Sequence, residues 1–177
     1  MGTNADHIAQ QAGGFEPQRQ NNFSLEILGL TGNDKDLISL ALSGISEIPG
    51  AENATIEIAY QNEKRYVAGP AVVGPFTLSL VDYVDMGVRD AVLRWRSQVY
   101  DPTTGNIGLA KNYKKLGNLI LNAPDDSSYR VGQLIGIWPN TDPKGGLDMN
   151  SGEKVLMEIP IVVDKVIWAQ GITASPP

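Results

Sequence analysis

Hydrophobic residues alternate with small or polar ones along several stretches of the chain, and a period of two is the pattern of strands with one buried face. In Leu37–Ser43, for example, Ile38, Leu40 and Leu42 would point to the same face of a sheet. The pattern predicts strands at residues 24–30, 37–43, 54–61, 64–68, 76–81, 113–122, 130–138 and 154–168. Pro160 lies inside the last of these and indicates a sheet edge or a bulge, because proline cannot donate a ladder hydrogen bond.

Glycine, proline and asparagine mark the connections between these strands. Asn62-Glu63 separates two alternating stretches and predicts a hairpin, and Pro49-Gly50 punctuates a loop over residues 44–52. Residues 101–112 and 139–152 are rich in glycine and polar side chains, and both are expected to be loops. Frequent turn signals between short strands favour antiparallel sheets.

One stretch follows a helical period instead. Its apolar residues recur at positions i, i+3, i+4, i+7 and i+11, namely Val88, Ala91, Val92, Trp95 and Val99. Asp85 is a candidate N-cap, and the Asp101-Pro102 pair would end the helix. We therefore expect a mainly β protein with antiparallel β-sandwich or barrel-like sheets and one flanking α-helix over about residues 86–100.

The ends of the chain differ from its middle. Residues 1–22 are rich in glutamine, asparagine, glycine and alanine, so they cannot bury enough apolar surface to offset their ordering entropy. They form either a flexible arm in solution or an arm that orders on a neighbouring subunit. We expect one β domain over residues 23–170 and a short tail over residues 171–177.

Composition narrows the class of protein. The chain has 177 residues, and its 42% of hydrophobic residues suffices for the core of one domain. Its net charge of −6 argues against stable binding to nucleic acid or to an anionic membrane, because both need a basic surface. There is no cysteine, and no apolar run approaches the roughly 18 residues of a membrane span. Without a secretory leader, a soluble protein made in the cytoplasm is expected.

Residues suited to catalysis are sparse. The one histidine, His7, lies in the polar arm and not beside a nucleophile. Asp82 and Asp85 could pair for acid–base chemistry, but a helix cap explains at least one of them more simply. The Gly105–Gly108 turn lacks the longer spacing of a phosphate-binding loop. We therefore expect no catalytic residue, no cofactor and no metal.

The order of several short motifs resembles a known family. These motifs are Tyr60 with Arg65-Tyr66, Gly74-Pro75 before the strand TLSLVDY, Leu93-Arg94-Trp95, Val99–Pro102, Tyr113–Lys115, Ile137–Pro139 and Glu158–Ile161. Over about residues 23–170 the arrangement resembles the tail tube proteins of contractile-tailed bacteriophages. More distantly, it is similar to the haemolysin-coregulated protein of type VI secretion.

The resemblance implies that six copies form a ring, that inner strands join into a barrel around a pore, and that rings stack into the tail tube of a virion. Assembly would take place in the host cytoplasm. The implied partners are further copies of the chain, the tail sheath, the tape measure protein, and the baseplate and tail terminator proteins. Double-stranded DNA would pass through without stable binding, since a lumen that bound phosphate would stall it. No membrane partner is implied.

Three groups of residues are candidate contacts in such a tube. Thr55 and Glu57 are lumen candidates, because their strand has a small or polar face. Arg89, Arg94 and Arg96 on the outer face of the helix would meet either an acidic sheath surface or only solvent. Ring stacking is expected at two turns and at the arm, and the residues of the turns are Pro49, Gly50, Asn62, Glu63, Lys64 and Arg65.

Other classes of function stay open at this point. A tube protein of the type VI kind is the nearest alternative. A non-catalytic β-sandwich binding module would need an exposed aromatic platform, and the chain is only 7% aromatic. A carboxylate-based hydrolase would need two acidic residues that converge in a pocket.

Overall fold

The computed structural model describes residues 18–125 and 127–169. The protein is mainly β. The strands are β1 (Phe23–Leu28), β2 (Leu42–Ile45), β3 (Ala51–Tyr60), β4 (Glu63–Val73), β5 (Phe76–Val81), β6 (Lys115–Asn122), β7 (Ser128–Pro139), β8 (Leu156–Val162) and β9 (Lys165–Trp168). The helices are α2 (Asp34–Ala41), α3 (Val88–Ser97) and α4 (Ala110–Tyr113).

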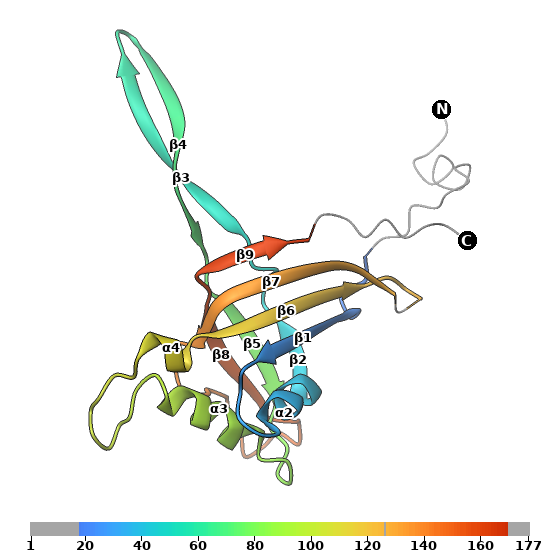
Figure 1. Ribbon diagram of the computed structural model, residues 1–177. Coiled ribbons are helices and arrows are strands. Elements are labelled where there is room, and N and C mark those ends of the chain that lie inside the picture. Colours follow the sequence, from blue (N-terminus) through green and yellow to red (C-terminus); the bar gives the residue numbers. More distant parts are fainter. Residues whose placement is uncertain (1–17, 126, 170–177) are drawn as a thin grey trace, which may run out of the picture.

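The body of the protein is a sandwich of two antiparallel layers (Figure 1). One layer has the order β1-β6-β7-β9, and the other has the order β2-β5-β8. Strand β7 belongs to both, because it pairs with β9 through Ile135 and with β8 at Trp138 and Pro139. The strand path ends at β1 and β2, so the sheet does not close into a barrel. The sandwich predicted from the alternating pattern is confirmed.

The core lies between the two layers and under the helices. Alternate residues of the strands point inward and are buried, as in Phe76, Leu78 and Leu80 on β5 and Met157, Ile159 and Ile161 on β8. Each fully buried side chain of this size contributes about 1.5–3 kcal/mol relative to exposure. The apolar alternation along these strands therefore supplies the driving force that holds the layers together.

Helix α3 confirms the helix predicted over about residues 86–100, but it is shorter at both ends and covers Val88–Ser97. Four of the five residues of the predicted stripe lie on its buried face, namely Val88, Ala91, Val92 and Trp95. The residue before the helix is Gly87 in the left-handed conformation (φ 64°), so the predicted N-cap at Asp85 is wrong. The left-handed turn at a glycine redirects the chain into the helix without a side-chain cap.

The strand predicted at residues 37–43 is wrong, because residues Asp34–Ala41 form helix α2. The alternation of Ile38, Leu40 and Leu42 suits a strand, but Ile38 and Ala41 also share a helical face. That face is the buried one, since Ile38 is 2% exposed and Leu40 is 66% exposed. Asp34 and Asp36 in the first turn suit the positive end of a helix. The protein therefore has α2 and α4 in addition to α3, which is the one flanking helix that the sequence predicts.

Several strand boundaries also differ from the predictions. β2 and β3 include the two ends of the loop predicted at residues 44–52, and β4 continues to Val73. Tyr113 belongs to α4, so the strand predicted from this residue begins at Lys115. The strand predicted at residues 154–168 is divided into β8 and β9 by a corner at Asp164, whose backbone N–H donates to Ile135 O at 3.1 Å. A corner lets one alternating stretch serve both layers.

Pro160 lies in β8 where the sequence predicts an edge or a bulge. Its pairing with Thr77 continues the unbroken register between β8 and β5. On the other side of β8, strand β7 reaches only Ile161 and Val162. β8 is thus an inner strand between β5 and β7, and the predicted edge is wrong. Pro160 lies just past the end of the pairing with β7, where its carbonyl accepts from the Asn140 backbone N–H at 2.9 Å.

Candidate assembly surfaces

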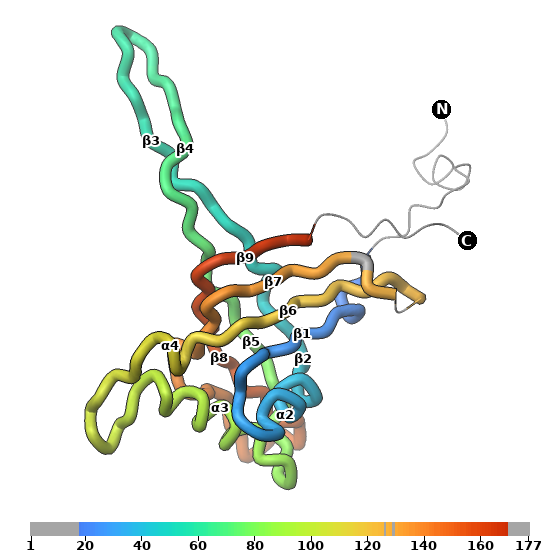
Figure 2. Tube along the Cα trace, viewed as in Figure 1, coloured from blue at the N-terminus to red at the C-terminus, as the bar shows by residue number. Residues whose placement is uncertain are grey.

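The hairpin β3–β4 leaves the body as a long two-stranded arm (Figures 1 and 2). Its strands have 10 and 11 residues and pair from Ala51 with Val73 to Tyr60 with Glu63. Ten residues of strand span roughly 33 Å. Almost every residue of the hairpin is exposed, although an isolated two-stranded hairpin is at best marginally stable in water. The predicted hairpin is confirmed, but its turn is Gln61-Asn62 and not Asn62-Glu63, and its strands extend further toward the body than predicted.

A turn and a bulge shape this hairpin. Gln61 has φ 56° and lies in the two-residue turn, whose left-handed conformation matches the twist of the strands. Nearer the body, Gly69 and Pro70 together lie opposite Ala54, which is the arrangement of a β-bulge. Proline is tolerated there because the ladder is interrupted. Asn53 Nδ2 donates to Gly69 O at 2.9 Å and secures the bulge.

The hairpin has one predominantly apolar face. Residues that are paired across strands point to the same side, so Ile56, Ile58 and Tyr60 share a face with Val67 and Arg65, and with Glu63 at the tip. Ile56, Ile58 and Val67 are 47%, 47% and 46% exposed. The Arg65 guanidinium carbon lies 5.3 Å from the centroid of the Tyr60 ring. We call these residues other than Glu63 the apolar face. The alternating pattern predicts a strand here with its apolar side buried. In the protomer, that side of β3 is exposed.

The opposite side, the polar face, carries Thr55, Glu57, Lys64 and Tyr66. Both lumen candidates, Thr55 and Glu57, lie on it, as their alternation with the isoleucines predicts. Lys64 Nζ lies 2.9 Å from Glu57 Oε1, and both side chains are largely exposed. Such a pair adds little stability, but it leaves the face close to electrical neutrality.

Four of the six stacking candidates meet at the tip of the hairpin. Asn62, Glu63, Lys64 and Arg65 are all exposed there. The other two lie in the segment that leads into β3, where Gly50 is exposed and Pro49 is buried. The side chain of Pro49 therefore packs within the protomer and is not offered to a neighbour.

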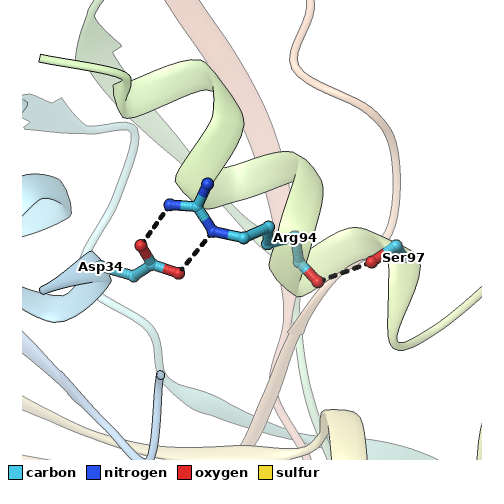
Figure 3. A network of polar contacts seen from close by, with 3 residues as sticks. All are labelled: Asp34, Arg94 and Ser97. Carbon is cyan, nitrogen blue, oxygen red and sulfur yellow. Dashed lines mark hydrogen bonds and ion pairs between the residues drawn. The ribbon is translucent and has the colours of Figure 1, made fainter. Parts of the chain in front are cut away.

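The arginines of α3 have partners within the protomer. Arg94 donates from Nε to Asp34 Oδ2 at 3.1 Å and from a terminal nitrogen to Asp34 Oδ1, so the contact has two prongs (Figure 3). The hydrogen bond with Asp34 raises the pKa of Arg94. Asp34 is only 6% exposed, so this pair ties α2 to α3 through a buried carboxylate.

Arg89 donates to Asp82 Oδ2 from Nε at 2.9 Å and from a terminal nitrogen at 2.7 Å. The Arg96 side chain is 18% exposed, and its Nε lies 3.4 Å from Asp142 Oδ1 without an aligned hydrogen bond. A sheath contact through these arginines stays a prediction, and it would depend on the exposed parts of Arg89 and Arg94. The carboxylate partners lie up to sixty residues away along the chain, so the local pattern gave no sign of them.

The remaining candidate chemistry has a structural explanation. Asp101 accepts hydrogen bonds from the Thr103 backbone N–H and the Thr104 hydroxyl, which lower the pKa of its carboxyl and close the turn before Gly105. Within the described ranges, no three His, Cys, Asp or Glu residues converge as a metal ion would require. His7 lies outside the described residues. None of the helices in the described part of the chain is both long and apolar enough to cross a lipid bilayer.

No family model and no curated protein matches the chain. Solved structures do match it. A chain of the sheath–tube complex of an extracellular contractile injection system, PVC, has a TM-score of 0.64 at 16% identity over 95% of this chain and 99% of that one. The tube-terminating cap of the anti-feeding prophage has a TM-score of 0.66 at 18% identity over 96% and 99%. The chain has the fold of contractile injection system components.

A type six secretion system protein also matches, with a TM-score of 0.51 at 10% identity over 83% of this chain and 82% of that one. At these identities the likeness concerns the fold. The fold expected from the resemblance to tail tube proteins is thereby confirmed.

Proposed function

We propose that this protein is the repeating structural subunit of the tube of a contractile machine. The first candidate for this machine is the tail of a contractile-tailed bacteriophage. One observation carries the proposal. A fold shared with sheath–tube and tube-cap structures bears a long hairpin whose apolar face has no cover in the protomer. Exposed apolar surface of this kind marks a contact with another protein.

The open sandwich supports a ring of copies. Strands β1 and β2 end the strand path, and unpaired edges invite pairing with another chain. A head-to-tail contact between identical copies closes into a ring when the rotation between them divides a full turn. We propose rings of six copies, stacked through Gly50 and through the tip residues Asn62, Glu63, Lys64 and Arg65.

The hairpin has one polar and one apolar face, as expected for a tube wall that faces water in the lumen and protein on the other side. We propose that the polar face with Thr55 and Glu57 lines the lumen, while the apolar face packs on protein. A lumen without free cations does not hold phosphate, and Lys64 is already paired with Glu57. Double-stranded DNA would therefore pass during ejection without stable binding.

The other proposed partners follow from the tube as a whole. The outer surface, including the exposed parts of Arg89 and Arg94, would contact the sheath, and the tube ends would contact baseplate and terminator proteins. A tape measure protein would occupy the lumen during assembly in the host cytoplasm. The protein would act in the virion as a structural component and not as an enzyme.

A second candidate is the tube of a headless injection system, because the matched structures include an extracellular contractile injection system. The two candidates differ in the particle that contains the protein. Particles purified from the producing culture and imaged by electron microscopy would carry DNA-filled capsids in the first case and would be headless in the second.

The direct test is negative-stain electron microscopy of the purified protein over a range of concentrations. We expect rings or hollow tubes with sixfold symmetry and a regular axial repeat. Ile58→Ser on the apolar face is expected to abolish them at an unchanged melting temperature, whereas Leu40→Ser, which changes an exposed residue of α2, should leave them intact. A wild-type protein that remains monomeric at every concentration would contradict the proposal.

A further inference from the structure

A pair of loops forms the end of the body opposite to the hairpin tip (Figure 1). One loop covers residues 82–87 after β5, and the other covers residues 140–155 before β8. The Asp82 backbone N–H donates to Val155 O at 3.0 Å, and the β5–β8 pairing brings Val81 opposite Leu156. The two segments are therefore neighbours, and we call them the loop pair.

The loop pair holds large apolar side chains out in water. Val84 is 100% exposed, Leu147 is 85% exposed, and Met149 is fully exposed as well. Tyr83 beside them is exposed to 44%. Isolated exposed apolar residues are common on protein surfaces, but four on two adjoining loops at one end of the molecule indicate a contact surface.

These side chains are exposed although both loops are anchored. Asp82 of the first loop binds Arg89, and Asp142 of the second lies 3.4 Å from Arg96 Nε. The backbones of Lys144 and Glu158 exchange hydrogen bonds in both directions, at 3.1 and 2.6 Å. Because the backbone is fastened at these points to α3 and β8, the tips of the loops are presented outward and do not fold back onto the core.

We propose that the loop pair is the docking surface for the apolar face of the hairpin of a second copy of this chain. The inference rests on the proposed tube function. The hairpin and the loop pair lie at opposite ends of one protomer, and a contact between two different surfaces repeats from copy to copy along an axis. In such a contact Val84, Leu147 and Met149 of one copy cover Ile56, Ile58 and Val67 of the next.

Charge favours the same pairing. The loop pair has five acidic and two basic residues, and Asp85, Asp148 and Glu153 are in no ion pair within the described residues. The hairpin tip carries two basic residues, Lys64 and Arg65, and one acidic residue, Glu63, and Arg65 lies against Tyr60 and is in no ion pair in the described part of the chain. Docking would place this cation near the free carboxylates, and the attraction strengthens as the contact excludes water.

Cysteine cross-linking tests the proposal, because the wild-type chain contains no cysteine. Single variants Ile58→Cys on the hairpin and Val84→Cys or Met149→Cys on the loop pair are mixed in pairs, assembled and oxidised. A disulfide forms only when the two Cα atoms approach within about 7 Å. We expect a linked dimer on a non-reducing gel from Ile58→Cys with at least one loop variant, and only background from each variant alone or from Ile58→Cys with Leu40→Cys.

Electron microscopy of the same samples distinguishes a failure of the proposed docking surface from a failure of the proposed tube function. Tubes in which Ile58→Cys links to Leu40→Cys, or to neither loop variant, would overturn the docking surface and leave the tube function standing. Wild-type protein assembled in parallel that forms no rings or tubes would overturn both. Melting curves of the four variants should match that of the wild type, because all four positions lie on the surface.

Discussion

Gly136 has a left-handed backbone conformation at the position where β7 passes from one layer of the sandwich to the other. It lies between the part of β7 that pairs with β9 and the part that pairs with β8. Its φ is +70°, and a Cβ built there would meet Asp164 Oδ2 at 2.2 Å. Asp164 is itself held by Lys114 at 2.6 Å. A glycine is needed for both the backbone angle and the space.

Gly136→Ala is expected to lower the free energy of unfolding by about 1–3 kcal/mol, because it adds backbone strain and displaces a fixed carboxylate. Guanidinium chloride unfolding followed by tryptophan fluorescence measures the change. Gly146→Ala is the matched control, since Gly146 has an ordinary φ and no neighbour within 4 Å of its added Cβ. Equal effects of the two substitutions would show that Gly136 has no special role.

Helix α2 shows how an element can satisfy two periodicities. The residues predicted as a strand at 37–43 place Ile38 and Leu40 on one face if extended and on different faces if helical. The structure buries Ile38 and exposes Leu40. The Ser39 hydroxyl donates to Leu25 O at 2.9 Å, and Asp34 binds Arg94, so neighbouring elements select the helix.

A pair of truncations tests this assignment. Ile38→Ala should lower the free energy of unfolding by about 2–5 kcal/mol, as expected for a buried aliphatic side chain. Leu40→Ala should change it by no more than about 0.5 kcal/mol, as expected at the surface. Urea unfolding measures both. Similar losses for the two residues would favour the strand over the helix.

At the scale of the whole molecule, the hairpin and the body are largely independent. The core residues lie in the sandwich and the helices, and the hairpin contributes to the core only at its base, where Val73 packs. Stability should therefore depend on the body, while assembly should depend on the hairpin.

Removing residues 54–70 and joining Asn53 to Ala71 through Asn-Gly tests this division. Asn53 and Ala71 are cross-strand partners, and Asn-Gly is a favoured two-residue turn between such partners. We expect a melting temperature within about 4 °C of the wild type. Sedimentation velocity should then show monomers, with no tubes by electron microscopy. A shortened protein that unfolds, or one that still forms tubes, would contradict the division.

Much of the fold was predictable because local patterns decide it. The stripe on α3, the hairpin turn, and the alternation in β1, β5, β6 and β7 each place apolar residues on one face, and burial follows in all but the hairpin. For the hairpin, alternation located the two faces correctly. It could not show that the apolar face is left uncovered, because a strand pattern is the same whether its cover belongs to its own chain or to another.

The candidate contacts divide in the same way. The tip residues Asn62–Arg65 and the polar residues Thr55 and Glu57 were found from turn chemistry and period two, which are local properties. The pairing of Arg94 with Asp34 depends on a segment distant in sequence, and no local pattern marked Pro49 as buried. The apolar loop pair was also missed, since loops carry no periodic signal that distinguishes an outward side chain from a buried one.

The order of residues along the chain thus determined where strands and turns occur and which side chains share a face, because short-range sterics and hydrophobic periodicity act over a few residues. Tertiary structure decided that residues 34–41 are helical, that β7 turns a corner at Gly136, and that the hairpin extends away from the body. These features depend on contacts between distant segments. Their free energies add to local preferences that are otherwise closely balanced.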